Sequence, residues 1–426
     1  MEKSTDSTTL KTVLDTYQKW LELAGDTEFI ETILAARCDR KLQGDPVWLF
    51  VVGHSGGTKT ESVRALSGND IYTLDSLTDH TFVSGKVEEG KPVKGLLPQL
   101  DGKILVIKDF SVILSSREEV RNAIFSQLRA LHDGYLECGY GTLSEPIRVN
   151  AKIGLVAACT PHLDSYGKMN AVLGDRFLRL RHDVDDRTAL GLRAARNLGK
   201  EEEMRTELQA VTSKFIDDLR FKQIAPTEDQ LETFVAMACA TSLLRCHVMM
   251  KFWKNQVTDY EVAPNKEYPT RLTKQFLKLS ILLANVRGHN EIEIADLKTV
   301  QRVARDTCIQ PRLKIIRSMI GGDTARSSKQ IADVVGIPKT TVWRELKELQ
   351  YLGLVDYDEG IEGNLELDGW QLKEPEQYRI LFDDLESLPV SQSTLGRYLD
   401  NNNVGTALSC VLCETTQQPP ASIVKA

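Results

Sequence analysis

The sequence predicts an α/β fold in which helices cover both faces of a mostly parallel sheet. Three short apolar runs, at residues 47–52, 104–107 and 153–158, predict the buried strands of this sheet. None of them alternates with polar residues, which is typical of strands buried on both faces. An amphipathic helix is predicted over 117–133, so strands and helices alternate along the chain.

Length and patterning divide the chain into five parts. Its 426 residues are enough for two or three domains with a sizeable core. Apolar spacing over 8–40 predicts an N-terminal helix, and we find no strand pattern from about 188 to 310. The predicted parts are an N-terminal helical segment (1–43), an α/β core (44–187), an all-helical region (188–310), a module of short helices followed by short strands (311–375) and a weakly patterned tail (376–426).

Composition and charge exclude several classes of protein. No apolar run is long enough to cross a membrane, and the N-terminus lacks the apolar core of a secretion signal. The eight scattered cysteines are typical of reduced thiols, so we expect a cytoplasmic protein. Cys410 and Cys413 form a lone CxxC, which argues against a zinc site. The net charge of −7 excludes a uniformly basic nucleic-acid-binding protein, but not a local basic face.

A phosphate-binding loop is predicted directly after the first strand. The sequence GHSGGTKT at 53–60 follows that strand and leads into a short helix. Such a Gly-rich turn directs backbone N–H groups at an anion, and a lysine adds a point charge. The loop departs from the usual pattern at Thr58, where a second glycine is usual before Lys59. A β-branched residue tolerates close backbone approach or a positive φ poorly.

The alternative is a Gly-rich turn that binds no ligand, but the strand–loop–helix context favours a nucleotide site. In that site, Lys59 would hold the β- and γ-phosphates of ATP and Thr60 would bind Mg²⁺. The predicted nucleotide-binding residues are Gly53, His54, Ser55, Gly56, Gly57, Thr58, Lys59, Thr60 and Glu61.

A carboxylate that serves Mg²⁺ or the attacking water is expected at the end of a neighbouring strand. The second strand ends in Lys108, Asp109 and Phe110, where two acids are usual. Two alignments are open. Either Lys108 replaces the metal-binding acid and Asp109 polarises water, or Asp109 binds the metal and Phe110 replaces the second acid. Both leave one carboxylate, which predicts slow hydrolysis or a group supplied from elsewhere. The alternative is that Asp109 only caps the following segment.

Further candidates follow the third strand. Thr160 lies at its end, where a hydroxyl group can hydrogen-bond the γ-phosphate or the attacking water. Arginines then cluster at 176, 179 and 181, and one of them is a candidate for the γ-phosphate of a neighbouring subunit. The alternative for this cluster is a solvated basic edge.

The order of these motifs resembles that of an AAA+ ATPase. The stretch YPTRLTKQFLKLSILLANVRGHNEIEIADLKTVQRVARD at 268–306 is similar to the lid of minichromosome maintenance helicases. The span 40–310, about two-thirds of the chain, also resembles AAA+ ATP-binding proteins of phages and mobile elements, through segments such as GDPVWLFVVG, LLPQLDGKILVIKDF and LGDRFLRLR.

This resemblance implies a P-loop AAA+ core with an all-helical lid. It also implies nucleotide-dependent homo-oligomers, with a hexameric ring as one form, and ATP hydrolysis at subunit interfaces. Thr160 corresponds to sensor 1, Arg176 to the arginine finger and Arg271 to sensor 2. The predicted catalytic residues are Lys59, Asp109, Thr160, Arg176 and Arg271, and the predicted Mg²⁺ ligands are Thr60 and Asp109.

Residues 326–357 resemble a winged helix-turn-helix. Ser327 or Ser328 caps a first helix, and a second is predicted over 339–350. A strand begins at 352–355, and 365–372 would return as its partner. The second helix would present Lys339, Thr340, Thr341 and Arg344 to DNA.

The charge of this module favours DNA as its partner. Segment 312–350 contains eight basic and four acidic residues, a net +4 in a chain of −7. The alternative is a protein-docking module, because Glu345 and Glu348 dilute the basic face of the second helix.

Three functions fit these features. The first is a helicase-like or replication-associated ATPase of a phage or mobile element that acts on DNA. The second is a winged-helix transcription regulator whose degenerate nucleotide domain binds ATP without efficient turnover. The third is a scaffold that binds neither ATP nor DNA.

Overall fold

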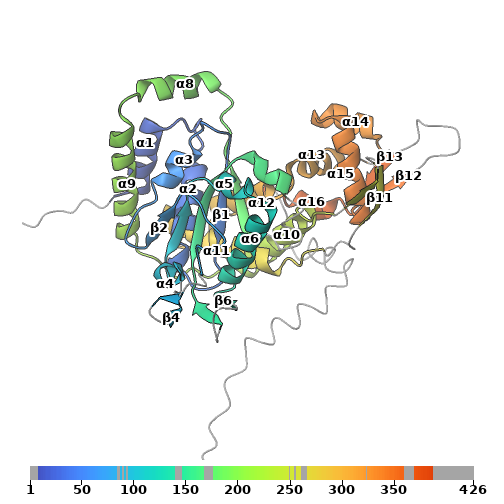
Figure 1. Ribbon diagram of the computed structural model, residues 1–426. Coiled ribbons are helices and arrows are strands. Elements are labelled where there is room, and N and C mark those ends of the chain that lie inside the picture. Colours follow the sequence, from blue (N-terminus) through green and yellow to red (C-terminus); the bar gives the residue numbers. More distant parts are fainter. Residues whose placement is uncertain are drawn as a thin grey trace, which may run out of the picture.

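The computed structural model describes residues 8–83, 87–88, 91–92, 95–139, 146–166, 176–248, 250–253, 256–260, 266–322, 324–358 and 369–386. Figure 1 shows an α/β body on the left and a smaller group of helices and strands on the right, formed by the end of the described chain. The lone CxxC at 410–413 and most of the predicted tail lie outside these residues.

A five-stranded, all-parallel sheet forms the centre of the body, which confirms the predicted α/β class. In order across the sheet, its strands are β2 (Ile71–Leu74), β5 (Ile104–Ile107), β8 (Gly154–Cys159), β1 (Trp48–Val52) and β9 (Phe177–Arg181). β1, β5 and β8 are the three predicted strands, whereas β2 and β9 have no counterpart in the prediction.

Helices cover both faces of the sheet because successive side chains of each strand point to opposite sides. Leu49 and Val51 of β1 belong to the hydrophobic core that contains α2 (Thr27–Arg37) and α3 (Lys59–Arg64). Trp48 and Phe50 face the opposite core. The helices of that second face are α4 (Leu97–Leu100), α5 (Ser111–Leu114) and α6 (Glu118–His132).

The N-terminal segment forms two helices rather than the single helix predicted over 8–40. α1 (Leu10–Trp20) ends before Ala24 and Gly25, which both have positive φ (50° and 78°). Asp26 then caps α2 by accepting the backbone N–H of Phe29. A 3-10 turn, η1 (Asp39–Lys41), follows α2. All residues of α2 from 29 to 37 are buried, so this helix is a layer of the α/β core.

The region after the sheet is mainly helical. Its helices are α8 (Arg187–Arg196), α9 (Glu201–Asp218), α10 (Glu228–Leu244), α11 (Thr270–Arg287) and α12 (Ile294–Thr307). α9 packs against α1, while α11 packs against α2 and α12 against β9. A two-stranded hairpin, β10 (Met250–Trp253) with β11 (Gln256–Tyr260), interrupts this region, so the prediction of helices alone is wrong here.

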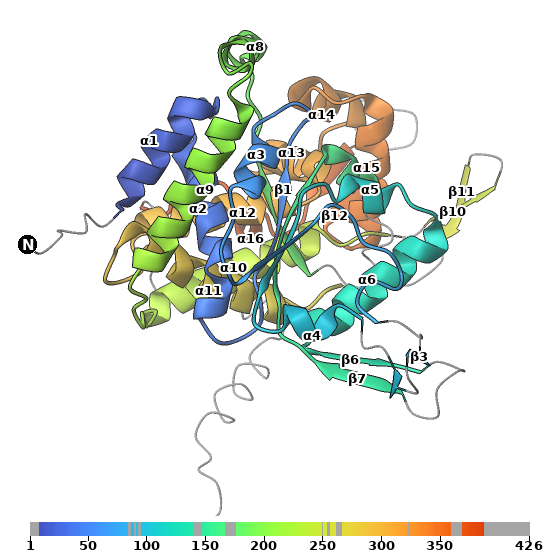
Figure 2. The ribbon, with the colours of Figure 1, turned by 60° about the vertical axis from the view of Figure 1, so that its left-hand side comes forward.

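Two small hairpins lie at the end of the sheet opposite α8, as Figure 2 shows. One pairs β6 (Tyr135–Cys138) with β7 (Ile147–Asn150), and the other pairs β3 (Val87–Glu88) with β4 (Lys91–Pro92). A 3-10 helix, η2 (Pro161–Tyr166), follows β8 at the other end.

The C-terminal module consists of three helices, a pair of strands and a last short helix. These are α13 (Gln310–Met319), α14 (Ser328–Val335), α15 (Lys339–Tyr351), β12 (Val355–Asp358), β13 (Gly369–Leu372) and α16 (Glu376–Arg379). Of the two predicted caps, Ser327 is the one that caps α14, through the N–H of Gln330. β12 and β13 are antiparallel, as predicted for this hairpin, and residues 365–368 lie outside the described part.

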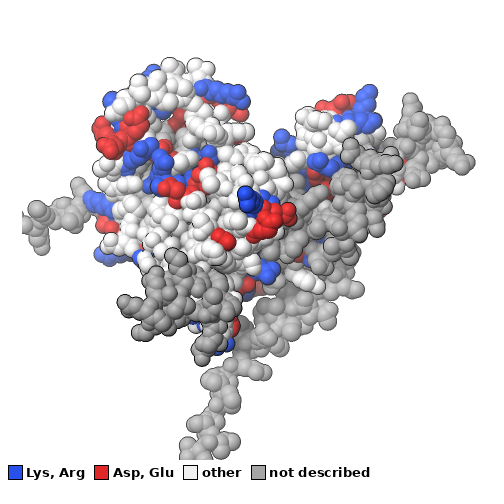
Figure 3. Space-filling view, in the orientation of Figure 1, with Lys and Arg blue, Asp and Glu red and all other residues white. Residues whose placement is uncertain are grey.

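No helix in the described part of the chain is long and apolar enough to span a membrane. Figure 3 shows acidic and basic side chains interspersed over the face that it presents, in keeping with the modest net charge.

Candidate functional site

Three of the predicted site segments meet at one edge of the sheet. β1, β5 and β8 are parallel neighbours, and they end at the loop 53–60, at Asp109 and at Thr160 respectively. In α/β proteins, ligands bind outside the carboxyl ends of the strands. The sheet therefore brings the predicted phosphate loop, acid and hydroxyl group together.

The backbone of the loop explains where glycine is needed. A Cβ atom on Gly53 would lie 2.9 Å from the carbonyl oxygen of His182, which follows the adjacent strand β9. Gly56 has a φ of 80°, in the left-handed region. Thr58 has φ −69° and ψ −18°, which any residue adopts. The expectation that Thr58 strains the loop through a positive φ is therefore wrong, because Gly56 is the residue that takes that conformation.

Lys59 lies inside the loop rather than in solvent. Its side chain is buried, and its ammonium group donates to the carbonyl oxygen of His54 at 3.1 Å. Burial lowers the pKa of Lys59, and the negative charge of Asp109 opposes that shift. The lysine is thus oriented by its own loop, within the electrostatic reach of the acid from β5.

The three residues at the end of the second strand have different environments. The ammonium group of Lys108 pairs with Asp75 at 2.9 Å, after β2 and away from the loop. Phe110 is fully buried in the core. Asp109 is exposed, and one carboxylate oxygen accepts the backbone N–H of Ser111 at 2.9 Å. Asp109 therefore caps the following turn. Its negative charge also favours the protonated form of Lys59.

Ser111 connects Thr160 to the turn that follows Asp109. The sequence did not predict this serine as a site residue. The Ser111 hydroxyl accepts the backbone N–H of Thr160 at 3.2 Å, and the two hydroxyl oxygens lie 3.3 Å apart. Asp109, Ser111 and Thr160 thus form one connected polar group. The only sequence signal for Ser111 is its position two residues after the predicted acid.

Two other predicted nucleotide-site residues have protein partners. The carboxylate of Glu61 binds Arg205 of α9 through two contacts of 2.9 Å, and it also contacts Arg64 at 3.1 Å. His54 lies 3.6 Å from Asp183, and both side chains are exposed. Glu61 therefore connects the helix after the loop to the helical region.

Arg176 and Arg271 do not lie at the phosphate-loop edge of their own chain. Arg176 precedes β9, whose first residue, Phe177, is paired with the first residue of β1. The loop follows the last residue of β1, so a strand about 16 Å long separates the two positions. Arg176 pairs with Asp133 at 3.0 Å, and Arg271 contacts Glu267 at 3.4 Å.

The two arginines are nevertheless neighbours of each other. Burial lowers the pKa of Arg271, and the positive charge of Arg176 lowers it further. The structure therefore forms two separate groups of predicted catalytic residues. Lys59, Asp109 and Thr160 lie at the carboxyl edge, whereas Arg176 and Arg271 lie at the amino edge.

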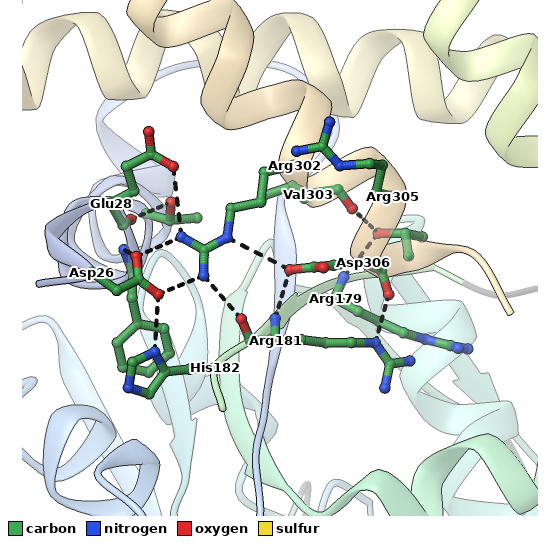
Figure 4. Close-up of polar contacts among 12 residues, drawn as sticks. Asp26, Glu28, Arg179, Arg181, His182, Arg302, Val303, Arg305 and Asp306 are labelled. Carbon is green, nitrogen blue, oxygen red and sulfur yellow. Dashed lines mark hydrogen bonds and ion pairs between the residues drawn. The ribbon is translucent and has the colours of Figure 1, made fainter. Parts of the chain in front are cut away.

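A network of charged residues connects the phosphate-loop edge to helix α12 (Figure 4). Arg302 of α12 binds both carboxylate oxygens of Asp26, at 2.5 and 2.6 Å, and the carbonyl oxygen of Arg181 at 3.0 Å. Although burial opposes it, Arg302 holds the pKa of Asp26 well below its usual value. Asp26 also contacts His182 at 2.9 Å, next to Gly53.

The same network accounts for the arginines that suggested a basic edge. The backbone N–H of Arg181 donates to Asp306, and its guanidinium binds Asp164 at 2.7 Å. Arg179 also pairs with Asp164, at 3.3 Å, and its side chain is buried. The solvated edge proposed as the alternative is therefore wrong for Arg179, because this arginine belongs to a buried strand and has an acidic partner.

The predicted DNA-contacting residues share the outer face of α15. Lys339, Thr340 and Arg344 are exposed, and Thr341 is half-buried. Glu345 and Glu348 lie on the inner side, where the fully buried Arg312 binds both of them. The expectation that these two acids dilute the basic face is therefore wrong for Glu348, which is buried and paired with Arg312, whereas the buried Glu345 also contacts Arg344 at 3.5 Å.

No group of three or more His, Cys, Asp or Glu residues suited to a metal ion occurs among the described residues. Mg²⁺ does not require such a group, since it commonly binds through one or two protein oxygens, waters and substrate phosphates. Thr60 and Asp109 are the residues that could supply those oxygens. In comparisons with known proteins, no family model and no curated protein matched this chain.

Proposed function

We propose that the protein is an ATP-binding AAA+ protein that hydrolyses ATP at subunit interfaces and acts on DNA. The observation that carries the proposal is the meeting of a buried lysine, an acid and a hydroxyl group at one edge of a parallel sheet. These are Lys59 in the loop after β1, Asp109 after β5 and Thr160 after β8. Phosphoryl transfer needs such a lysine, a metal-binding acid and a group that positions water.

The fit of the loop to a polyphosphate supports ATP as the ligand. Lys59 and the backbone N–H groups of 53–60 would hold the phosphates. The Thr58 hydroxyl is buried and has no hydrogen-bond partner in the described structure, so it is a polar group that a ligand would satisfy. Thr60 and Asp109 would hold Mg²⁺, which supplies neutralisation of the phosphate charge.

The remoteness of Arg176 and Arg271 supports hydrolysis between subunits. Neither arginine can reach the loop of its own chain, because the length of β1 lies between them. In a ring or filament with head-to-tail contacts, the amino edge of one subunit would meet the loop of the next. The two arginines would then stabilise the charge that develops on the transferred phosphoryl group.

A DNA-binding role for the C-terminal module is supported by its charge distribution. We propose that α13, α14, α15 and the β12–β13 pair form a winged helix, with α15 as its recognition helix. Once Arg312, Glu345 and Glu348 are set aside as a buried group, segment 312–350 retains seven basic and two acidic residues (8 − 1 and 4 − 2).

A regulator that binds ATP without turnover is the second candidate. It is favoured by the single acid at the end of β5, because Lys108 is committed to Asp75 and Phe110 to the core. Phosphate release from Mg·ATP, measured with and without DNA, separates the two candidates. The motor predicts turnover that DNA stimulates and that Asp109→Asn abolishes. Tight ATP binding without turnover in either condition would reject the motor and retain the regulator.

A further inference from the structure

An exposed tryptophan lies in the middle of the proposed DNA-binding face. Trp343 of α15 is 44% exposed, whereas Trp20, Trp48 and Trp370 are at most 4% exposed. Single exposed apolar side chains are common on protein surfaces, but the large, flat ring of a tryptophan is well suited to a binding contact. Trp343 is therefore a candidate contact residue, and its neighbours indicate what it would contact.

The neighbours of Trp343 on the helix are cations. Lys339 and Lys347 lie one turn before and one turn after it, and Arg344 is adjacent. The only acids of α15, Glu345 and Glu348, are buried and bind Arg312, and Glu345 also contacts Arg344 at 3.5 Å. The face around Trp343 is therefore basic and free of exposed carboxylates from this helix.

Lys347 lies close to Trp343 and to two aromatic residues of the strand pair. The ammonium group of Lys347 lies 5.8 Å from the centre of the Trp343 ring, and 5.1 Å from the rings of both Tyr357 and Trp370. Tyr357 and Trp370 lie on β12 and β13, with ring centres 4.6 Å apart. The three rings and the ammonium group of Lys347 thus combine aromatic and cationic groups on one side of the module.

We propose that Trp343 stacks on nucleobases, and that this face therefore prefers DNA with unpaired bases. The inference rests on the proposed DNA-binding role of α15 and adds the class of DNA that it binds. A flat ring among cations matches both parts of a nucleotide, since the ring stacks on the base and the cations contact the phosphates. A duplex offers only base edges in its grooves, because its base faces are already stacked.

Binding of the full chain to a fluorescent single-stranded oligonucleotide and to the matching duplex tests the proposal. Trp343→Ala should weaken single-strand binding roughly 5- to 150-fold, which is the range for loss of one aromatic stack. Duplex binding should change little, and Trp343→Phe should recover most of the loss. Because Trp343 is a stacking group, its removal should leave the salt dependence unchanged.

Two control variants make the result specific. Lys339→Ala should weaken binding to both DNAs and reduce the slope of affinity against salt by about one. Val334→Ala, which trims another exposed apolar residue on α14, should change neither. Equal losses on the duplex and the single strand, or no loss on either for Trp343→Ala, would overturn the role of Trp343 while leaving DNA binding intact. If the wild type binds neither DNA, the proposed DNA function itself fails.

Discussion

Thr58 occupies the loop position at which a glycine is usual, and its backbone is relaxed there. Its φ of −69° and ψ of −18° fall in the right-handed helical region, and its side chain is buried. A glycine at this position would gain no conformational relief and would add freedom to the unfolded chain. The departure from the motif is therefore compatible with a stable phosphate loop.

A return to the consensus glycine should accordingly destabilise the protein. We expect Thr58→Gly to lower the free energy of unfolding by about 0.5–1 kcal/mol. Denaturant unfolding in the absence of nucleotide measures the change. Gly56→Ala makes the reverse kind of change, from glycine to a residue with a side chain. It should also destabilise the protein, because the φ of 80° at position 56 disfavours any side chain. A stability gain for Thr58→Gly would show that the loop is strained after all.

Asp306 makes stability depend on pH. Burial raises the pKa of this carboxyl from 3.8 to about 6. The folded protein therefore holds the proton more tightly than the unfolded chain, and this contribution to stability is present at low pH. It is lost as the pH rises through the range from about 4 to about 6.

The variant Asp306→Asn isolates this contribution, since asparagine can still accept the backbone N–H of Arg181. We expect the wild type to lose stability relative to the variant as the pH rises from about 4 to about 6. The loss should be on the order of 3 kcal/mol, for a shift of about two pKa units. Urea unfolding of both proteins across this range provides the measurement, and parallel pH profiles would contradict the prediction.

Helix α15 is held in place by one buried ionic group. Arg312 of α13 binds Glu345 and Glu348 of α15, and it also donates to the carbonyl oxygen of Cys246 after α10. The arginine thus connects the outer basic helix to the helical region. Removing one partner of such a group leaves charges buried and unpaired.

We expect Arg312→Met to destabilise the C-terminal module by about 3–5 kcal/mol, whereas Lys314→Met on the exposed side of the same helix should have little effect. Tryptophan fluorescence during guanidinium unfolding measures the change, and Trp343 and Trp370 of the module contribute to it together with the tryptophans elsewhere in the chain. If Glu345→Leu and Glu348→Leu are added to Arg312→Met, most of the stability should return. Failure of that recovery would mean that Arg312 acts through its packing rather than its charge.

The elements that could be predicted are those whose burial is evident from the local pattern of apolar residues. Strands β1, β5 and β8 are continuous apolar runs because both of their faces are covered, and the sequence located all three. Strand β9 was missed because Arg179 and Arg181 alternate with leucines in it. Their acidic partner, Asp164, is 15 and 17 residues away.

The same reason limited the prediction of the sites. Lys59, Asp109 and Thr160 follow predicted parallel strands, so their meeting at one edge could be expected from the sequence. Glu345 and Glu348 were expected to face solvent because their partner, Arg312, lies more than 30 residues earlier. Burial of a charged residue depends on a partner that no local pattern identifies.

At the scale of the whole molecule, the loop and the arginines lie at opposite edges of one sheet. If Arg176 takes part in hydrolysis, it must therefore act on ATP that is bound to another subunit. This makes assembly a condition of turnover, which Mg·ATP should promote. Mass photometry with and without Mg·ATP should show larger assemblies in its presence, and an unchanged monomer would argue against hydrolysis between subunits.

A mixing experiment tests the exchange of arginines directly. Lys59→Ala removes the loop's lysine, and Arg176→Ala removes the proposed finger, so each variant alone should lose roughly 10³-fold or more in turnover. A one-to-one mixture should regain activity, because about a quarter of head-to-tail contacts would pair an intact loop with an intact arginine. If the mixture is as inactive as its components, Arg176 does not take part in ATP hydrolysis between subunits.

The central claim is that the loop 53–60 binds ATP through Lys59. Isothermal titration of the full chain with Mg·ATP tests it most directly, in the wild type, in Lys59→Ala and in the control Lys108→Ala. Lys108 lies at the same edge of the sheet but pairs with Asp75. We predict that the wild type and Lys108→Ala bind Mg·ATP and that Lys59→Ala does not. Equal binding by all three proteins, or no binding by the wild type, would contradict the claim.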